Sequence, residues 1–248
     1  MTLNIMTWNT QLYEYGNKVG NTRKKIENSK FEPIMEFVDK HLEKENAIVV
    51  LQEIPYKSNV TWKEHELFRC FREKYDANEY DVIFNISSIS QIKMTVVLSK
   101  KGLIDKSSNK KHNCYVPFKI KGTDISALAV HSHNAFECRD YIRNDVQNQY
   151  NMILGDFNAG NYIKKEKDEE IAINRQNYLL LLEGYNDICQ GEYTTVYKTF
   201  IDHILLASDY DFLMLHKCLN INVYRDVKLS DHYPIVFELS ICDDEKLL

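Results

Sequence analysis

Apolar residues in this chain gather in short runs, which predict buried β-strands. The runs are too short for most helices, and many are rich in the β-branched and aromatic residues that strands favour. They cover residues 3–8, 47–53, 81–86, 94–99, 114–120, 124–130, 152–154, 198–208, 219–224 and 232–241. A mainly strand-built core follows from this pattern.

Other segments carry apolar residues at helical spacing. They cover residues 32–46, 62–75, 137–150 and 165–183. In the first, Pro33 stands near the start, where its missing N–H costs little, and apolar positions recur on one face at Ile34, Phe37, Val38 and Leu42. In the second, the inward positions are Leu67, Phe68, Phe71 and Tyr75. Helices therefore interleave with the strands.

The connections between strands decide the kind of sheet. A parallel pair needs a crossover connection, usually a helix, and many of these strands follow one another after only a short loop. A mixed sheet therefore fits better than a purely parallel one. We expect an α/β sandwich with two mixed sheets face to face and helices outside.

Composition is that of an ordinary globular protein of 248 residues, with 44% hydrophobic and 27% charged residues. Its 4 prolines and 8 glycines form no linker, so one continuous domain over residues 1–248 is expected. No apolar run approaches the roughly 20 residues that span a bilayer, and no secretory signal is evident at the first residues. Six scattered cysteines without a C-x-x-C pair predict free thiols in a reducing compartment, and hence a cytoplasmic protein. No membrane contact is expected.

A net charge of -5 argues against nucleic-acid binding through bulk positive charge. It does not exclude a nuclease, because a bound metal ion supplies positive charge locally. The lysines between residues 100 and 111 fit a solvated loop, and the alternative is that they steer phosphate groups. No feature indicates an obligate protein partner.

The chain is organised around the stretch MILGDFNAG, residues 152–160. Asp156 and Asn158 follow the strand and, two positions apart in extended chain, face the same way. A carboxylate beside an amide suits a site that handles a hard cation and a phosphate oxygen together. The alternative is an ordinary Asx turn at the end of a strand.

Polar residues recur where other apolar strands begin or end. They are Asn9, Glu53, His131, Asp202, Asp231 and His232. Each has a plain structural explanation when taken alone, such as a solvated residue, a turn or a buried pair. Their recurrence at strand ends, where rigid elements hold side chains next to loops that admit substrate, indicates a catalytic site.

Taken together, the motifs TWNT, LQE, VHS, GDFNAG, IDHIL and SDHYP resemble the endonuclease/exonuclease/phosphatase superfamily, which has the DNase I-like fold. They occur in family order and span residues 7–234. The resemblance implies a four-layer α/β/β/α sandwich. It also implies magnesium-dependent cleavage of phosphate esters.

The resemblance assigns Glu53 as the principal metal carboxylate, with Asn9 beside it and Asp231 as an acid on the metal or the water side. Magnesium takes oxygen ligands and keeps several waters, so one or two carboxylates suffice. Mg²⁺ is the expected ion, and Mn²⁺ is a possible substitute.

The resemblance also assigns the remaining residues. Asp156 would orient or deprotonate the attacking water, and Asn158 would donate to a phosphate oxygen. His232 would lie against the scissile phosphate with Asp202 as its orienting carboxylate. His131 would contact phosphate or protonate the leaving group.

A contact between Asp202 and His232 also follows from burial. A carboxylate inside an apolar strand needs a partner, and we expect one of its oxygens within hydrogen-bond distance of the His232 ring. His203, the next residue along the strand, should point to the opposite face. His133 is a spare histidine that faces either the site or solvent.

Two departures from the family pattern bear on the substrate. Phe200 stands where family members often carry an arginine, so one phosphate contact is missing. Ile54 and Pro55 follow Glu53, unlike the abasic-site repair branch, which disfavours that activity. The favoured function is a magnesium-dependent phosphodiesterase acting on DNA or RNA. The alternatives are hydrolysis of a small or lipid phosphoester and a catalytically inactive binding protein.

Overall fold

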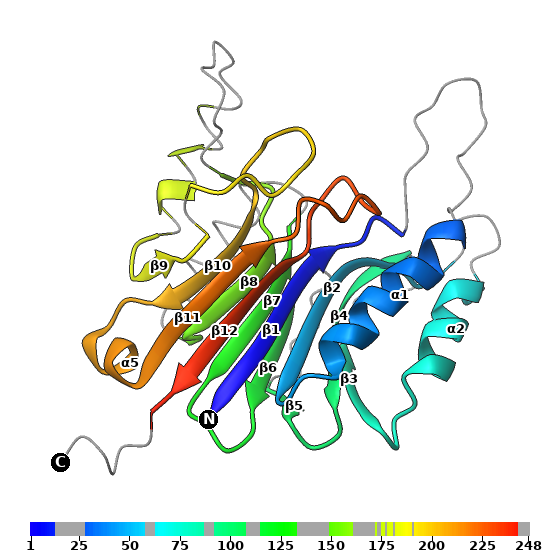
Figure 1. The fold of residues 1–248 in the computed structure, drawn as a ribbon, viewed down its shortest axis with the longest axis horizontal. Helices are drawn as coiled ribbons and strands as arrows, with labels where there is room; N and C mark the ends of the chain where they lie inside the picture. Colours follow the sequence, from blue (N-terminus) through cyan, green and yellow to red (C-terminus); the bar gives the residue numbers. More distant parts are fainter. Residues whose placement is uncertain are drawn as a thin grey trace.

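The computed structural model describes residues 1–12, 28–57, 63–86, 92–107, 115–132, 149–160, 172, 175–176, 178–180, 182–189 and 191–242. Within them, two six-stranded sheets pack face to face (Figure 1). The first sheet contains, in spatial order, β11 (His216–Val223), β12 (Ile235–Ile241), β1 (Thr2–Asn9), β2 (Ala47–Pro55), β4 (Lys93–Lys100) and β3 (Tyr80–Phe84). The second contains β5 (Ile104–Lys106), β6 (Tyr115–Ile120), β7 (Ser126–His131), β8 (Met152–Asp156), β10 (Asp202–Ala207) and β9 (Tyr185–Asp187).

Both sheets are mixed. β1 and β2 are parallel in the first sheet, β7 and β8 are parallel in the second, and the other neighbouring strands are antiparallel. The carboxyl ends of the parallel strands therefore lie at one edge of the sandwich, together with the amino ends of their antiparallel neighbours β4, β10 and β12. In Figure 1, β1 ends at this edge and β12 begins there. We call it the site edge.

Alternation along the strands divides the apolar side chains between two cores. In β1, Leu3 and Ile5 belong to the core shared with the second sheet, whereas Met6 and Trp8 belong to the core beneath the helices. Helices α1 (Asn28–Leu42) and α2 (Glu66–Lys74) cover the outer face of the first sheet (Figure 1). The expected sandwich with two mixed sheets is confirmed.

Every strand expected from an apolar run is present. Among the residues that the structure describes, three elements were not predicted: the short edge strands β5 and β9, and helix α5 (Tyr210–Leu215). β5 lies in a segment that was interpreted as loop; with three residues at a sheet edge and two of them exposed, it leaves no apolar pattern. α5 has only six residues, with exposed Leu213 and Met214, so it too lacks a helical stripe.

The helices differ from expectation at their ends. α1 begins at Asn28 and so contains Pro33 inside it, and α2 is limited to Glu66–Lys74, where Leu67, Phe68 and Phe71 are buried as expected. Most of the two later segments with helical periodicity lies outside the described residues. Within the second of them, residues 178–180 are helical, and Tyr178 packs in the core of the second sheet. Among the helices that the structure describes, none has the length and apolar character to cross a bilayer.

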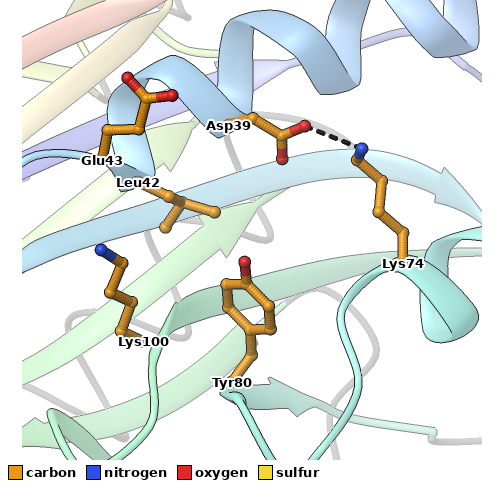
Figure 2. Close-up of a pocket in the computed structure, with 6 residues that line it drawn as sticks. All are labelled: Asp39, Leu42, Glu43, Lys74, Tyr80 and Lys100. Atoms are coloured by element: carbon orange, nitrogen blue, oxygen red, sulfur yellow. Dashed lines mark ion pairs between the residues drawn. The ribbon is translucent and has the colours of Figure 1, made fainter.

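The opposite edge of the sandwich carries a hollow of about 300 Å³ beside the end of α1 (Figure 2). Its lining is Asp39, Leu42, Glu43, Lys74, Tyr80 and Lys100. Asp39 pairs with the Lys74 ammonium at 2.8 Å and accepts a hydrogen bond from the Tyr75 hydroxyl at 2.9 Å. The acidic and basic groups of this hollow thus offset one another, unlike those at the site edge.

Candidate active site

Strand register brings three of the predicted residues into one row. Asp156 lies directly opposite His131 of β7 and directly opposite Asp202 of β10. Residues opposite one another on neighbouring strands point to the same face. His131, Asp156 and Asp202 therefore form a buried row across the end of the second sheet.

Gly155 is required for this row because the backbone approaches closely there. Its φ of 136° lies in a region that side chains disfavour, and an added Cβ would lie 2.0 Å from the carbonyl oxygen of Val130. The glycine of the GDFN motif is thus explained by the tight pairing of β8 with β7.

Asn9 reaches this row from the first sheet. It is the last residue of β1, and alternation turns it to the same face as Ile5, toward the second sheet. Its amide nitrogen donates to Asp156 Oδ2 at 2.9 Å, and its amide oxygen accepts from the backbone N–H of Gln11 at 3.1 Å. The end of β1 is therefore joined directly to the end of β8.

Glu53 reaches the site through an irregularity in β2. The register with β4 shifts between Leu51 and Ile54, and both of those side chains face the helices. Glu53 between them has a φ of 60°, a left-handed conformation that is unfavourable for this residue type. The bulge turns Glu53 to the other face, where its Oε1 lies 3.3 Å from His131 Nε2 across the sandwich.

Lys93 is a site residue that the sequence did not reveal. Its ammonium lies 2.5 Å from Glu53 Oε1. Burial alone would raise the pKa of Glu53, but the hydrogen bond with His131 and the positive charges of Lys93 and His131 lower it to about 2. Lys93 is the first residue of β4, which runs antiparallel to β2, so it begins at the site edge; a lysine at the start of a strand carries no sequence signal of a role in a site.

His232 is held by Asp202, as expected. Its Nδ1 lies 2.8 and 3.0 Å from the two Asp202 oxygens. The Thr194 hydroxyl, which the sequence did not reveal, donates to Asp202 Oδ2 at 2.7 Å. Trp8 Nε1 donates to the His232 carbonyl at 3.0 Å, so backbone and ring are both fixed.

The electrostatic surroundings keep His232 protonated. Burial would lower its pKa, but the negative charges of Asp202, Asp156 and Asp231 and the Asp202 hydrogen bond raise it to about 10. With Nδ1 used by Asp202, the other nitrogen, Nε2, lies 3.9 Å from Asp156 Oδ2 and 3.7 Å from Asp231 Oδ1. His232 is thus an imidazolium that presents one N–H to the carboxylates.

His203 points away from the site, also as expected. On the opposite face of β10, its Nδ1 lies 2.8 Å from Asp187 Oδ2 and its Nε2 donates to the Ala159 carbonyl at 2.6 Å. Phe200, at the position of the missing arginine, is buried edge-on against His203 with ring centroids 4.6 Å apart. Its side chain is therefore part of the core and supplies no phosphate contact.

Asn158 combines the two interpretations of the GDFN turn. Its backbone N–H donates to Asp156 Oδ1 at 2.9 Å, which is an Asx turn, and its φ is 49°. Its side-chain amide donates to the Ser132 carbonyl at 2.6 Å, so the loop after β8 is joined to the end of β7. His133, the spare histidine, lies outside the described residues.

Asp231 and Asp156 are the acids of the cluster whose pKa values are raised. Burial raises the pKa of Asp231, and the positive charge of His232 lowers it. The negative charges of Glu53, Asp202 and Asp156 raise it further, so that the pKa lies above its usual value. Burial also raises the pKa of Asp156. Asp231 Oδ1 is buried without a hydrogen-bond partner among the described residues. Such an acceptor suits a metal cation.

The ligand atoms of Asp156, Asp202 and His232 lie within 4.8 Å of one another, as a metal-binding group would. Asp202 is already engaged by Thr194 and by the His232 ring, and His232 Nε2 carries a proton, so neither is a ready ligand. The oxygens of Glu53, Asp156 and Asp231, with the amide oxygen of Asn9, are the donor set that suits a hard divalent cation.

No family model and no curated protein matches the sequence. Solved structures do match. The endonuclease domain of TRAS1, a telomere-specific non-LTR retrotransposon, is 15% identical with a TM-score of 0.61, covering 97% of this chain and 99% of that chain. An endonuclease/exonuclease/phosphatase family protein from Bacteroides thetaiotaomicron is 14% identical with a TM-score of 0.62, covering 98% and 99%.

A mannosyl-6-phosphatase from Bacteroides thetaiotaomicron is 15% identical with a TM-score of 0.56, covering 96% of this chain and all of that chain (100%). At these identities the matches show a shared architecture alone. Since they span nearly the whole of each chain, the resemblance carried by the sequence motifs is confirmed: this chain has the fold of the endonuclease/exonuclease/phosphatase superfamily.

Proposed function

We propose that the chain is a single-domain, divalent-metal-dependent hydrolase of phosphoesters, and that its substrate is a nucleic-acid phosphodiester. The observation that carries the proposal is the convergence of Glu53, Asp156 and Asp231 with the His232–Asp202 pair at one edge of the sandwich. The fold does not require this mostly buried acidic cluster beside a fixed imidazolium. This arrangement suits a cation and an anionic substrate bound together.

Glu53, Asp231, Asp156 and Asn9 would hold the metal, and Mg²⁺ is the ion that such oxygen donors favour, with Mn²⁺ as a substitute. Asp231 Oδ1 fits this role because it has no hydrogen-bond partner among the described residues. The low pKa of Glu53 fits it because a metal ligand must be deprotonated. When bound, the ion would neutralise phosphate charge and acidify a water.

The side chains divide the remaining work. Asp156, whose pKa burial raises, would accept the proton of the attacking water. His232 would donate its Nε2–H to a phosphate oxygen, and Asp202 would hold the ring in place and stabilise its charge. His131 and the Asn158 amide would contact the phosphate from the second sheet.

Two features bear on the kind of substrate. The solved structures with this fold include the endonuclease domain of TRAS1, which supports a nucleic acid. They also include the mannosyl-6-phosphatase, and Phe200 leaves this chain without the arginine contact expected at that position. Hydrolysis of a small phosphoester is therefore the second candidate.

The test is a turnover panel of single- and double-stranded DNA, RNA, sugar phosphates, inositol phosphates and lipids, with Mg²⁺ or Mn²⁺ and with EDTA. The proposal expects metal-dependent cleavage of a nucleic acid and none in EDTA. Cleavage confined to a small phosphoester supports the second candidate. Clean protein without metal-dependent turnover on any member contradicts both.

A cytoplasmic location is part of the proposal. Cys70, Cys189, Cys218 and Cys242 are free thiols, and the other two cysteines lie outside the described residues. Free thiols suit a reducing compartment. Fractionation of cells that express the protein would test this.

A further inference from the structure

Lys93 forms an ion pair with Glu53, the carboxylate that is the principal metal ligand in the proposed function. Lys93 Nζ lies 2.5 Å from Glu53 Oε1, and the side chains of Lys93 and Glu53 are only 14% and 13% exposed. The same oxygen lies 3.3 Å from His131 Nε2. One oxygen of Glu53 is therefore already in contact with the positively charged Lys93 ammonium and with the His131 ring.

This arrangement places Lys93 in competition with a divalent ion. A divalent ion bound at the Glu53 carboxylate and the Lys93 ammonium would repel one another strongly in a poorly solvated site. The pair is also more than a surface salt bridge, because both partners are mostly shielded from water. A metal that binds Glu53 Oε1 therefore favours departure of the ammonium from that oxygen.

The Lys93 side chain can move its ammonium to another anion. The backbone of Lys93 is fixed in β4, opposite Pro55 of β2, so its flexible four-carbon side chain can move without the strand. Phe200 stands where the resemblance predicts an arginine contact to the phosphate, and its ring is buried against His203. A substrate phosphate would therefore lack that contact. A substrate phosphate bound at the metal would bring a new anion into the site.

We propose that Lys93 is a displaceable counter-ion: it neutralises Glu53 in the metal-free protein and moves to the substrate phosphate when the metal binds. The inference rests on the proposed function for the identity of the anion. Its first half, competition between Lys93 and the metal, concerns the protein alone. It can be tested without any substrate.

The test compares Lys93→Met with Lys100→Met, which removes an exposed lysine from the opposite end of the same strand (Figure 2). Methionine keeps much of the side-chain length and removes the charge. Mn²⁺ affinity is measured by calorimetric titration without substrate. We expect Lys93→Met to bind Mn²⁺ about tenfold more tightly than the wild type, as loss of a nearby like charge requires, and Lys100→Met to bind it unchanged.

Mn²⁺-induced thermal stabilisation gives a second readout, which remains usable if Lys93→Met is less stable because Glu53 has lost its partner. We expect a larger rise in Tm on adding Mn²⁺ for Lys93→Met than for the wild type, and for Lys93→Gln as well. Unchanged or weaker Mn²⁺ binding in both variants, without a larger rise in Tm, overturns the inference.

The second half is tested on the substrate found by the turnover panel. With saturating metal, Lys93→Met should raise KM about tenfold, as expected for loss of one phosphate contact. An unchanged KM overturns the move to the phosphate and leaves the competition standing. If the wild type binds Mn²⁺ but cleaves nothing, the proposed function fails, while the calorimetric result still decides the competition.

Discussion

Asp202→Asn tests whether the His232 ring is held and charged by this one carboxylate. The substitution keeps the size and one hydrogen-bond acceptor but removes the negative charge. In the wild type, Asp202 contacts His232 Nδ1 through both oxygens, at 2.8 and 3.0 Å. It is also the strongest of the groups that raise the pKa of His232.

The size of the effect follows from the pKa. A histidine moved from 6.5 to about 10 has gained on the order of 5 kcal/mol in favour of its charged form, at about 1.4 kcal/mol for each tenfold. Asp156 and Asp231 contribute to this, so removing Asp202 should lower the pKa by roughly one to three pH units. That change corresponds to roughly 1.4 to 4 kcal/mol.

The same shift dictates how stability depends on pH. Because the folded pKa of His232 lies above its unfolded value, the stabilisation is fully present below about pH 6.5 and is lost as the pH rises toward 10. The destabilisation caused by Asp202→Asn should therefore be largest near pH 6. It should shrink by roughly 1.4 to 4 kcal/mol at pH values above the wild-type pKa.

The assay is histidine side-chain NMR titration and urea unfolding, both in EDTA so that no metal competes for the carboxylates. Asp187→Asn is the matched control, because Asp187 contacts His203 on the opposite face of β10. It should lower the pKa of His203 and leave that of His232 in place. If His232 still titrates near 10 in Asp202→Asn, or if the loss of stability is the same at pH 6 and pH 10.5, the reasoning is refuted.

Three other predictions follow from the site. Glu53→Gln should keep the fold but lower turnover by orders of magnitude, with partial recovery at high Mg²⁺; full activity in a steady-state assay would contradict the metal role. Asp202→Asn and His232→Gln should each lower turnover by ~10²-fold or more, and the double variant should be little worse than the worse single, as kinetics of all three will reveal. His203→Leu should cost about 3 to 5 kcal/mol in urea unfolding by removing the cation that pairs with the buried Asp187 carboxylate, and a cost below 1 kcal/mol would contradict a charged pair.

Much of the fold was readable from the sequence because its strands are buried and apolar. Runs such as MILGD remain strands wherever they pack, since all five residues from Met152 to Asp156 are buried. The elements that escaped prediction, β5, β9 and α5, are short and lie at sheet edges or the surface. Their conformation depends on pairing with a neighbour more than on their own residues.

The candidate site was only partly predictable. The acids, amides and histidines of the site could be predicted because they stand at strand ends. The Asp202–His232 contact could be predicted from the cost of burying an unpaired carboxylate. Lys93 and Thr194 were missed, since a lysine at a strand start and a threonine in a loop are ordinary. The β-bulge that turns Glu53 toward His131 has no sequence signal either, because a non-glycine residue with positive φ is set by its surroundings.

The site belongs to both sheets, and this explains why its acids are placed against their electrostatic preference. Asp156 and Asp202 come from the second sheet, whereas Glu53 and Asp231 come from the first sheet and the loop before β12. Packing the sheets together forces these carboxylates into one buried region, where the pKa values of Asp156 and Asp231 rise. Lys93 and the His232 imidazolium offset part of this repulsion, and Asp231 Oδ1 remains without a hydrogen-bond partner among the described residues. A divalent cation at the junction of the sheets would remove the rest, so the same ion would stabilise the sandwich and supply its chemistry.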